Sequence, residues 1–182
     1  INDQIGSANT YFPQQLTSLE KMVVILEDRR FFNHHGVDFL AVIRELAKLL
    51  IGKRHGGAST IDMQLVRTVT GYKALTIKRK LYECILAIII QRRYNKTQIL
   101  RSYMNCAFFG SHLIGATRAS QALFGQPPTN LDDSQAAFIA AMLVCPKPMR
   151  STPKWESRVK RRADYGYSIY ISNKDRFDKL PC

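Results

Sequence analysis

The fold is decided by residues 16–28, which read LTSLEKMVVILED. Thr17 and Glu20 fit the capping box S/T-x-x-E, in which two side chains satisfy free backbone N–H groups at the start of a helix. Apolar side chains then recur at the spacing of one helical face, at Leu16, Leu19, Met22, Val23 and Leu26. The segment predicts a helix that is buried along one side and presents Glu27 and Asp28 at its end.

Outside this segment, helical periodicity continues along the chain and signals for β-strands are few. We expect Asp38 to cap a second helix, Gly52 to end it, and Ser59 to cap a third helix. Further helices are predicted over residues 76–94, 97–105, 113–124, 132–143 and 153–172. The fold class is therefore mainly α, with a single domain over residues 1–182.

The second and fourth helices carry apolar stripes that we expect to face inward, because such stripes form a core more often than a membrane contact. In the second helix the stripe consists of Phe39, Val42, Ile43, Leu46, Leu49 and Leu50. In the fourth helix it consists of Ile77, Leu81, Ile85, Ile88 and Ile89.

The composition indicates a globular protein with an anionic partner. Hydrophobic residues make up 46% of the chain, and 27 basic against 14 acidic residues give a net charge of +13. A nucleic acid, an anionic membrane surface and a phosphorylated substrate would all satisfy this charge. The four cysteines form no CxxC pair, so no metal-ligand set is predicted from them.

Three clusters could carry chemistry, and the first is the turn that follows the helix, from Glu27 to Gly36. A carboxylate beside aromatic rings can have its pKa raised by desolvation, which suits a general acid or base. The alternative interpretation is a charged helix end with two core phenylalanines, in which His34 is a structural hydrogen-bonding residue.

The second and third clusters indicate an anion site. Gly57, Ser59 and Thr60 lead into a helix start, where free N–H groups and the helix dipole attract phosphate. Arg67 lies further along that helix. On the fourth helix, Arg79 and Lys80 share a face with Glu83, which fits either a solvated salt-bridge face or a cationic clamp on a pyrophosphate.

The order of these clusters resembles the glycosyltransferase family 51 domains, which polymerise peptidoglycan as monofunctional transglycosylases or as part of class A penicillin-binding proteins. The resemblance covers roughly residues 19–165 and rests on four motifs. Their matching residues are Glu27, Asp28, Phe31, His34 and Gly36; Gly57, Ser59, Thr60 and Gln64; Arg79, Lys80 and Glu83; and Lys96, Ile99, Leu100, Tyr103 and Asn105.

This resemblance implies a lysozyme-like head lobe and a smaller, membrane-facing jaw lobe at approximately residues 38–58. Part of the apolar stripe of the helix over 39–51 is then expected to sit in the lipid interface, where Lys48, Lys53 and Arg54 would meet anionic headgroups. It also implies polymerisation of lipid II with inversion and release of undecaprenyl pyrophosphate. Glu27 would be the catalytic base and Glu83 a second catalytic carboxylate. The substrate-binding residues would be Asp28, Phe31, His34, Ser59, Thr60, Gln64, Arg67, Arg79, Lys80 and Asn105.

The resemblance further implies the cofactors, partners and location. No cofactor is expected to be required, although a divalent ion, Mg or Mn, could accompany the pyrophosphate. The expected partners are lipid II, the growing lipid-linked glycan, an anionic membrane surface and other cell-wall synthesis proteins, with no nucleic acid. The location would be the bacterial cell envelope, at the outer (periplasmic) face of the cytoplasmic membrane.

Four positions depart from the family pattern: Asp62, Met63, Leu75 and Arg101. They leave open a degenerate scaffold that binds lipid II without turnover. A lysozyme-like hydrolase would also use a glutamate on a helical lobe, but it has less need of a pyrophosphate clamp. A nucleic-acid binder is indicated by charge alone, without a helix-turn-helix or zinc pattern.

Overall fold

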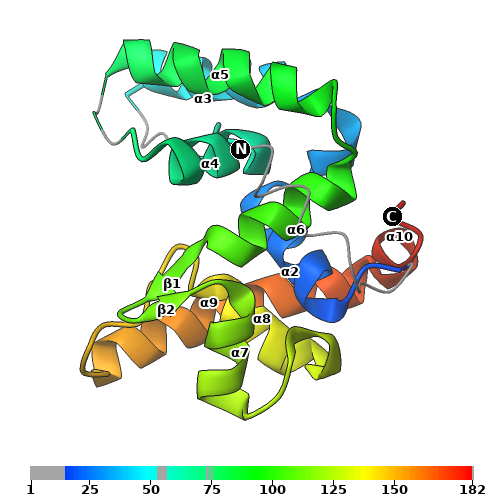
Figure 1. Ribbon diagram of the computed structural model, residues 1–182, viewed down its shortest axis with the longest axis vertical. Helices are drawn as coiled ribbons and strands as arrows, with labels where there is room; N and C mark the ends of the chain where they lie inside the picture. Colours follow the sequence, from blue (N-terminus) through cyan, green and yellow to red (C-terminus); the bar gives the residue numbers. More distant parts are fainter. Residues whose placement is uncertain (1–14, 53–56, 73, 75, 182) are drawn as a thin grey trace.

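The computed structural model describes residues 15–52, 57–72, 74 and 76–181. The fold is mainly α, as predicted, with one short β-hairpin (Figure 1). The helices are α2 (Ser18–Glu27), α3 (Phe39–Leu50), α4 (Ile61–Thr70), α5 (Ile77–Gln91), α6 (Lys96–Cys106), α7 (Ala116–Phe124), α8 (Asp133–Ala141), α9 (Pro153–Ser172) and α10 (Lys174–Asp178). The 3-10 turns η2 (Phe31–Asn33) and η3 (Pro128–Asn130) and the antiparallel strands β1 (Phe108–Gly110) and β2 (Leu113–Ile114) complete it.

The lower part of the molecule in Figure 1, which contains the main hydrophobic core, is called the larger lobe here. Helix α2 lies at its centre and packs against α8 and α9. The predicted capping box is confirmed, since the Glu20 N–H donates to Thr17 Oγ1 at 3.2 Å and the Thr17 N–H donates to Glu20 Oε2 at 2.7 Å. Leu19 and Met22 are fully buried in the main hydrophobic core. The helix ends at Glu27, as its sequence predicts.

The same capping carboxylate explains one departure from the family pattern. Arg101 Nε donates to Glu20 Oε1 at 2.7 Å, and both side chains are almost fully buried. A buried arginine needs such a partner, because an unpaired charge inside a protein is costly. The cation at position 101 therefore joins α6 to the start of α2.

Two helix starts differ from the predictions. Thr60, and not Ser59, caps α4, because the Thr60 hydroxyl accepts from the Met63 N–H at 3.2 Å while the Ser59 hydroxyl binds Lys80. The helix expected over 113–124 begins only at Ala116. Its first residues form β2 instead, since they pair with β1 in a hairpin.

A second, smaller core lies in the upper part of the molecule (Figure 1). Val37, Met63 and Ala87 form it, with Val42 of α3 and Ile88 of α5 packed against it. This contact joins α3 and α5 into a thin lobe. The predicted jaw boundary at 38–58 stays a prediction, and residues 53–56 lie outside the described residues.

The predicted inward stripes of α3 and α5 are largely wrong. Ile77 is 89% exposed and Leu50 87%, and the further exposed members are Phe39, Ile43, Leu81, Ile85 and Ile89. Helix α5 instead buries Glu83, Ala87 and Ile90. The physical reason is that, within the described residues, nothing covers these outer faces of α3 and α5, whose other faces pack on the small core. Of the predicted members, Val42 and Ile88 pack inward, and the side chains of Leu46 and Leu49 lie outside the described residues.

Gly36 connects the turn after α2 to α5. Its φ is +87°, and a Cβ there would lie 2.6 Å from the Ala87 carbonyl oxygen. We expect Gly36→Ala to lower the free energy of unfolding by about 3 kcal/mol, because backbone strain and a steric clash add together. Denaturant unfolding measures this loss.

The matched control is Gly71→Ala, where φ is +64° but a Cβ would meet nothing within 4 Å. This variant carries the strain alone, about 1 kcal/mol. Equal losses in the two variants would contradict the close approach at Gly36.

Candidate active site

A cleft of about 550 Å³ opens between the two lobes beside the end of α2. Its walls come from α3, from residues 57–60 before α4, and from α9. The charged residues that line it are Glu27, Asp28, Arg29, Arg30, Asp38, Arg44, Glu45, Lys48 and Arg162. Five of these nine are basic and four are acidic, and several pair with one another, so the cleft carries charge of both signs.

Glu27 is held on both of its carboxylate oxygens. Arg162 Nη2 donates to Glu27 Oε1 at 3.0 Å and to the Leu26 carbonyl oxygen at 2.8 Å. Gln64 Nε2 donates to Glu27 Oε2 at 3.1 Å. A carboxylate has about four lone-pair positions, so two contacts leave capacity to accept a proton.

Arg162 is a site residue that sequence reasoning missed. It lies within residues 19–165, which resemble the family, but outside the four motifs, and no local pattern linked it to Glu27, which lies far away in the chain. Only the packing of α9 against α2 brings them together.

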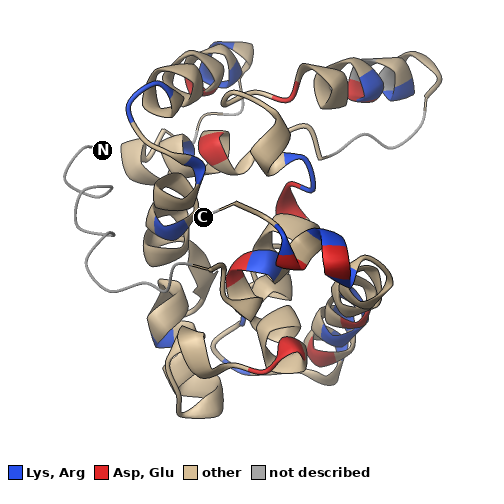
Figure 2. Ribbon diagram, turned by 90° about the vertical axis from the view of Figure 1, so that its right-hand side faces the viewer, with Lys and Arg blue, Asp and Glu red and all other residues tan. Residues whose placement is uncertain are grey.

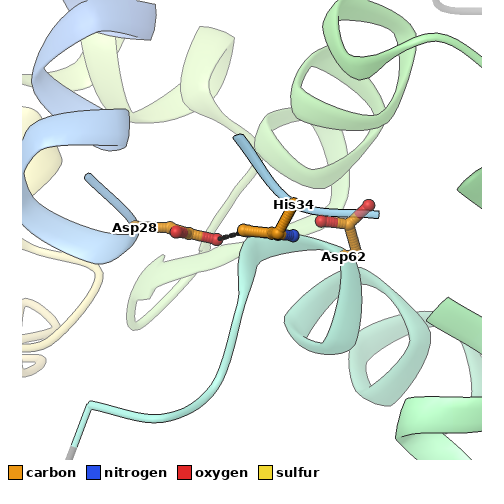
Figure 3. Close-up of side chains that lie close together, drawn as sticks. All are labelled: Asp28, His34 and Asp62. Carbon is orange, nitrogen blue, oxygen red and sulfur yellow. Dashed lines mark hydrogen bonds and ion pairs between the residues drawn. The ribbon is translucent and has the colours of Figure 1, made fainter. Parts of the chain in front are cut away.

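Behind Glu27, Asp28 and His34 bind each other (Figure 3). His34 Nε2 donates to Asp28 Oδ2 at 2.9 Å, because an ionised carboxylate can only accept. The Ile61 N–H donates to the same oxygen at 3.2 Å. Asp28 thereby connects the end of α2 to the start of α4.

Lys96 completes this cluster. Its Nζ donates to Asp62 Oδ2 at 3.0 Å, lies 3.5 Å from His34 Nδ1 and stands 4.3 Å above the centre of the Phe31 ring. Burial raises the pKa of Asp62 and lowers the pKa of Lys96, while the attraction between the two opposes both shifts. Asp62, a departure from the family pattern, is therefore matched by a cation.

These contacts give several predicted substrate-binding residues a different environment. Phe31 is fully buried beneath Lys96, and His34 is almost fully buried. The Thr60 hydroxyl caps α4 and donates to the Gly36 carbonyl oxygen at 2.6 Å. The alternative interpretation of the turn as core phenylalanines with a structural histidine describes Phe31 and His34, whereas Glu27 and Thr60 line the cleft.

A second cluster adjoins the cleft at Ser59. Lys80 Nζ donates to Ser59 Oγ at 2.6 Å and lies 3.6 Å from Glu83 Oε2, while Arg79 Nη1 lies 3.3 Å from Glu83 Oε1. Glu83 is only 1% exposed. Burial lowers the pKa of Lys80, Glu83 opposes this shift, and the nearby Arg67 adds to it. The predicted shared face of Arg79, Lys80 and Glu83 is confirmed.

Of the predicted site residues, Glu27, Asp28, Ser59 and Thr60 line the cleft. Asn105 neither lines it nor contacts the residues around Glu27 or Glu83 described above. It is exposed and lines a separate cavity of about 50 Å³, together with Thr17, Glu20 and Arg101. Its predicted contact with substrate stays a prediction, and this position does not support it.

The donor atoms fit a resident divalent ion poorly. Within the described residues, Asp28, His34 and Asp62 are the one group of three potential ligands, and the Lys96 ammonium already binds two of them. Glu83 is flanked by two cations, as described above. Basic side chains supply the positive charge at both places.

The balance of charge in the buried cluster can be tested with Lys96→Met. We expect the free energy of unfolding to fall by about 3 kcal/mol at pH 8, because the change leaves the Asp62 carboxylate buried without its cation. The pKa of Asp62 is already raised above 3.8, and it rises further without Lys96. A carboxyl group whose pKa is raised in the folded state stabilises the fold at low pH, where it is protonated. That contribution to the free energy of unfolding is lost as the pH rises through the raised pKa.

The loss caused by Lys96→Met should therefore be smaller at pH 5 than at pH 8. Urea unfolding at both pH values measures it, with the exposed Lys154→Met as the control that changes stability little. A loss of equal size at both pH values would contradict a charged Asp62–Lys96 pair.

Comparison with known proteins identifies the family. Residues 8–166 match the family described as Transglycosylase. The chain is 36% identical over 157 residues to the biosynthetic peptidoglycan transglycosylase of Acinetobacter baylyi, a match that covers 84% of this chain and 69% of that protein. It is 35% identical over 153 residues to penicillin-binding protein 1A of Rickettsia bellii, covering 82% of this chain and 19% of the relative.

A further relative is penicillin-binding protein 1A of Clostridium tetani, which is 34% identical over 175 residues, 89% of this chain and 22% of that protein. The chain thus spans about a fifth of the length of its penicillin-binding protein 1A relatives. The extent of these matches confirms the resemblance found in the sequence motifs. The chain belongs to the transglycosylase family, glycosyltransferase family 51, whose members are peptidoglycan glycosyltransferases.

Proposed function

We propose that this domain polymerises lipid II into glycan strands, with Glu27 as the general base. The observation that carries the proposal is the position of Glu27 at the wall of a cleft between the two lobes, held by Arg162 and Gln64. Because the carboxylate is already held in one orientation, little further orientational freedom is lost when it meets the reacting hydroxyl.

In the proposed reaction, Glu27 takes the proton from the sugar 4-hydroxyl of an incoming lipid II. That oxygen forms a bond to the anomeric carbon of the growing strand. The bond from this carbon to undecaprenyl pyrophosphate breaks with its electron pair, so pyrophosphate leaves and the configuration inverts. One base and one stabilised leaving group are sufficient for this displacement.

The cations near Ser59 suit the leaving pyrophosphate. Lys80 contacts Ser59 at the cleft, and buried Glu83 holds Arg79 and Lys80 in place. At the start of α4 the Ile61 and Met63 N–H groups are already bound by Asp28 and Thr60, so the basic side chains carry this role. Arg67, which lies near Lys80, adds positive charge. In this mechanism the arginines and lysine stabilise the leaving group without a resident metal, and Mg or Mn would enter only with the pyrophosphate.

The geometry favours this reaction over the alternatives. A hydrolase would need a second carboxylate free to face the sugar. Glu83 is buried among cations, and the other carboxylates of the cleft are already bound: Asp28 by His34, Asp38 by Arg30 and Glu45 by Lys48. Figure 2 shows Lys and Arg spread over both lobes and mixed with acids, which differs from the basic face of a nucleic-acid binder.

The family departures also do not disable the site, which weighs against a degenerate scaffold. Asp62 and Arg101 have ionic partners, and Met63 fills the small core. Leu75 lies outside the described residues. Glu27 keeps its two supporting donors.

The thin lobe suits contact with a membrane surface. The exposed apolar side chains of α3 and α5 are accompanied by Arg44 and Lys48, which would meet anionic headgroups. Within the described residues, no helix has the length and apolar character needed to cross a bilayer. We place the domain at the outer (periplasmic) face of the cytoplasmic membrane, where lipid II and the growing lipid-linked glycan would be presented to the cleft and other cell-wall synthesis proteins would act with it.

We expect Glu27→Gln to lower kcat for polymerisation of labelled lipid II by roughly 10²- to 10⁴-fold, because the amide cannot accept the hydroxyl proton. Binding of lipid II should persist, since Gln keeps the shape of the side chain. The product of the wild-type domain should be digestible by muramidase.

The control is Glu156→Gln, which removes an exposed carboxylate at the start of α9 and should polymerise normally. Polymerisation by Glu27→Gln at the wild-type rate would refute Glu27 as the base. Tight lipid II binding by the wild-type domain without polymer would favour the scaffold.

We expect the variant Ile43→Ser/Leu50→Ser to bind vesicles containing phosphatidylglycerol at least tenfold more weakly, because about 1.5–3 kcal/mol of burial is lost per large apolar side chain. Co-sedimentation measures the affinity. Ile171→Ser, at a half-exposed isoleucine on α9, is the control that should bind as the wild type does. Equal binding by all three proteins would exclude α3 as the membrane contact.

A further inference from the structure

We propose that Tyr103 is a positioning residue for this reaction, which orients the Gln64 amide and through it the catalytic carboxylate of Glu27. The proposal rests on the proposed function of Glu27 as the base. It assigns a role to a side chain on α6 that contacts neither the cleft nor the expected substrate.

Three side chains from three helices form a directed chain of hydrogen bonds. The Tyr103 hydroxyl donates to Gln64 Oε1 at 2.7 Å, and Gln64 Nε2 donates to Glu27 Oε2 at 3.1 Å. The order of donors follows from chemistry, because an ionised carboxylate only accepts and the amide must therefore turn its NH₂ group toward Glu27. The amide oxygen then faces Tyr103, which must donate.

Tyr103 is well suited to act as a permanent donor. Its side chain is 4% exposed. Burial raises the pKa of its hydroxyl far above the usual range, and the Glu27 carboxylate raises it further, so the proton stays on the oxygen. The two orientations of a glutamine amide, which exchange its oxygen and its NH₂ group, have nearly the same shape and differ only in hydrogen bonding. The hydroxyl is thus what distinguishes the correct orientation of Gln64 from the flipped one.

The consequence for Glu27 is control of the carboxylate plane. Arg162 holds Oε1 from the α9 side, and Gln64 holds Oε2 from the α4 side. Without the hydroxyl, Gln64 Oε1 loses its donor, the amide can rotate, and the carboxylate can turn about its remaining contact with Arg162. A misplaced base slows proton transfer but changes substrate binding little, since the cationic residues that would bind the pyrophosphate are untouched.

The first test is the steady-state kinetics of Tyr103→Phe with labelled lipid II. We expect kcat to fall by about 10- to 100-fold while KM stays within about twofold of the wild-type value. The matched control is Tyr170→Phe, which removes another buried hydroxyl, one that donates to Asp178 at 3.0 Å in the region of α10. This control should lose a comparable amount of thermal stability and keep its kcat.

The second test is a double-mutant cycle with Gln64→Ala. If Tyr103 acts through Gln64, the double variant polymerises no more slowly than Gln64→Ala alone, because the side chain that transmits the effect is already gone. If the two reductions in kcat multiply, Tyr103 acts independently of Gln64 and the proposal is overturned. A kcat for Tyr103→Phe equal to that of Tyr170→Phe overturns it as well.

Glu27→Gln in the same assay separates this inference from the function on which it rests. Activity of Glu27→Gln at the wild-type level overturns the assignment of the base, and the positioning role with it. Loss of activity in Glu27→Gln together with full activity in Tyr103→Phe overturns the positioning role alone.

Discussion

The site depends on the carboxylate of Asp28, which accepts hydrogen bonds from His34 and from the Ile61 N–H. These two bonds join the end of α2, the turn after it and the start of α4. The fold requires these hydrogen bonds, because the turn buries the Asp28 carboxylate and a buried carboxylate without donors is costly. Since Glu27 precedes Asp28, the direction in which the candidate base faces the cleft is set by a neighbour that the proposed reaction does not use.

Four basic side chains pair with buried carboxylates in the interior. Lys96 neutralises Asp62, Arg101 neutralises Glu20, and Arg79 and Lys80 flank Glu83. Removing one partner of such a pair leaves an uncompensated buried charge. The pairs of Lys96 with Asp62 and of Arg101 with Glu20 each join two helices, whereas Arg79, Lys80 and Glu83 all lie on α5. Departures from the family pattern at Asp62 and Arg101 persist because each acquires a partner of opposite sign.

The thin lobe follows a different physical rule. Its small core around Met63 and Ala87 gives α3 and α5 one packed side each. Apolar stripes that would be core in a thicker domain are therefore exposed, including Ile77 and Leu50. Periodicity shows that a helix has an apolar face, but it cannot show whether another element covers that face.

Local patterns were sufficient for the helical class, for the capping box of α2, and for α9 at residues 153–172, because hydrogen bonds within a few residues determine helix starts. Motif order was sufficient for the family, and it is the source of the proposal that Glu27 is the base. The partners of Glu27 could not be found in this way. Arg162 and Tyr103 are distant in sequence, and only the packing of α9 and α6 around α2 and α4 brings them to the site. Contacts between helices depend on side-chain packing across the whole core, which no short stretch of sequence encodes.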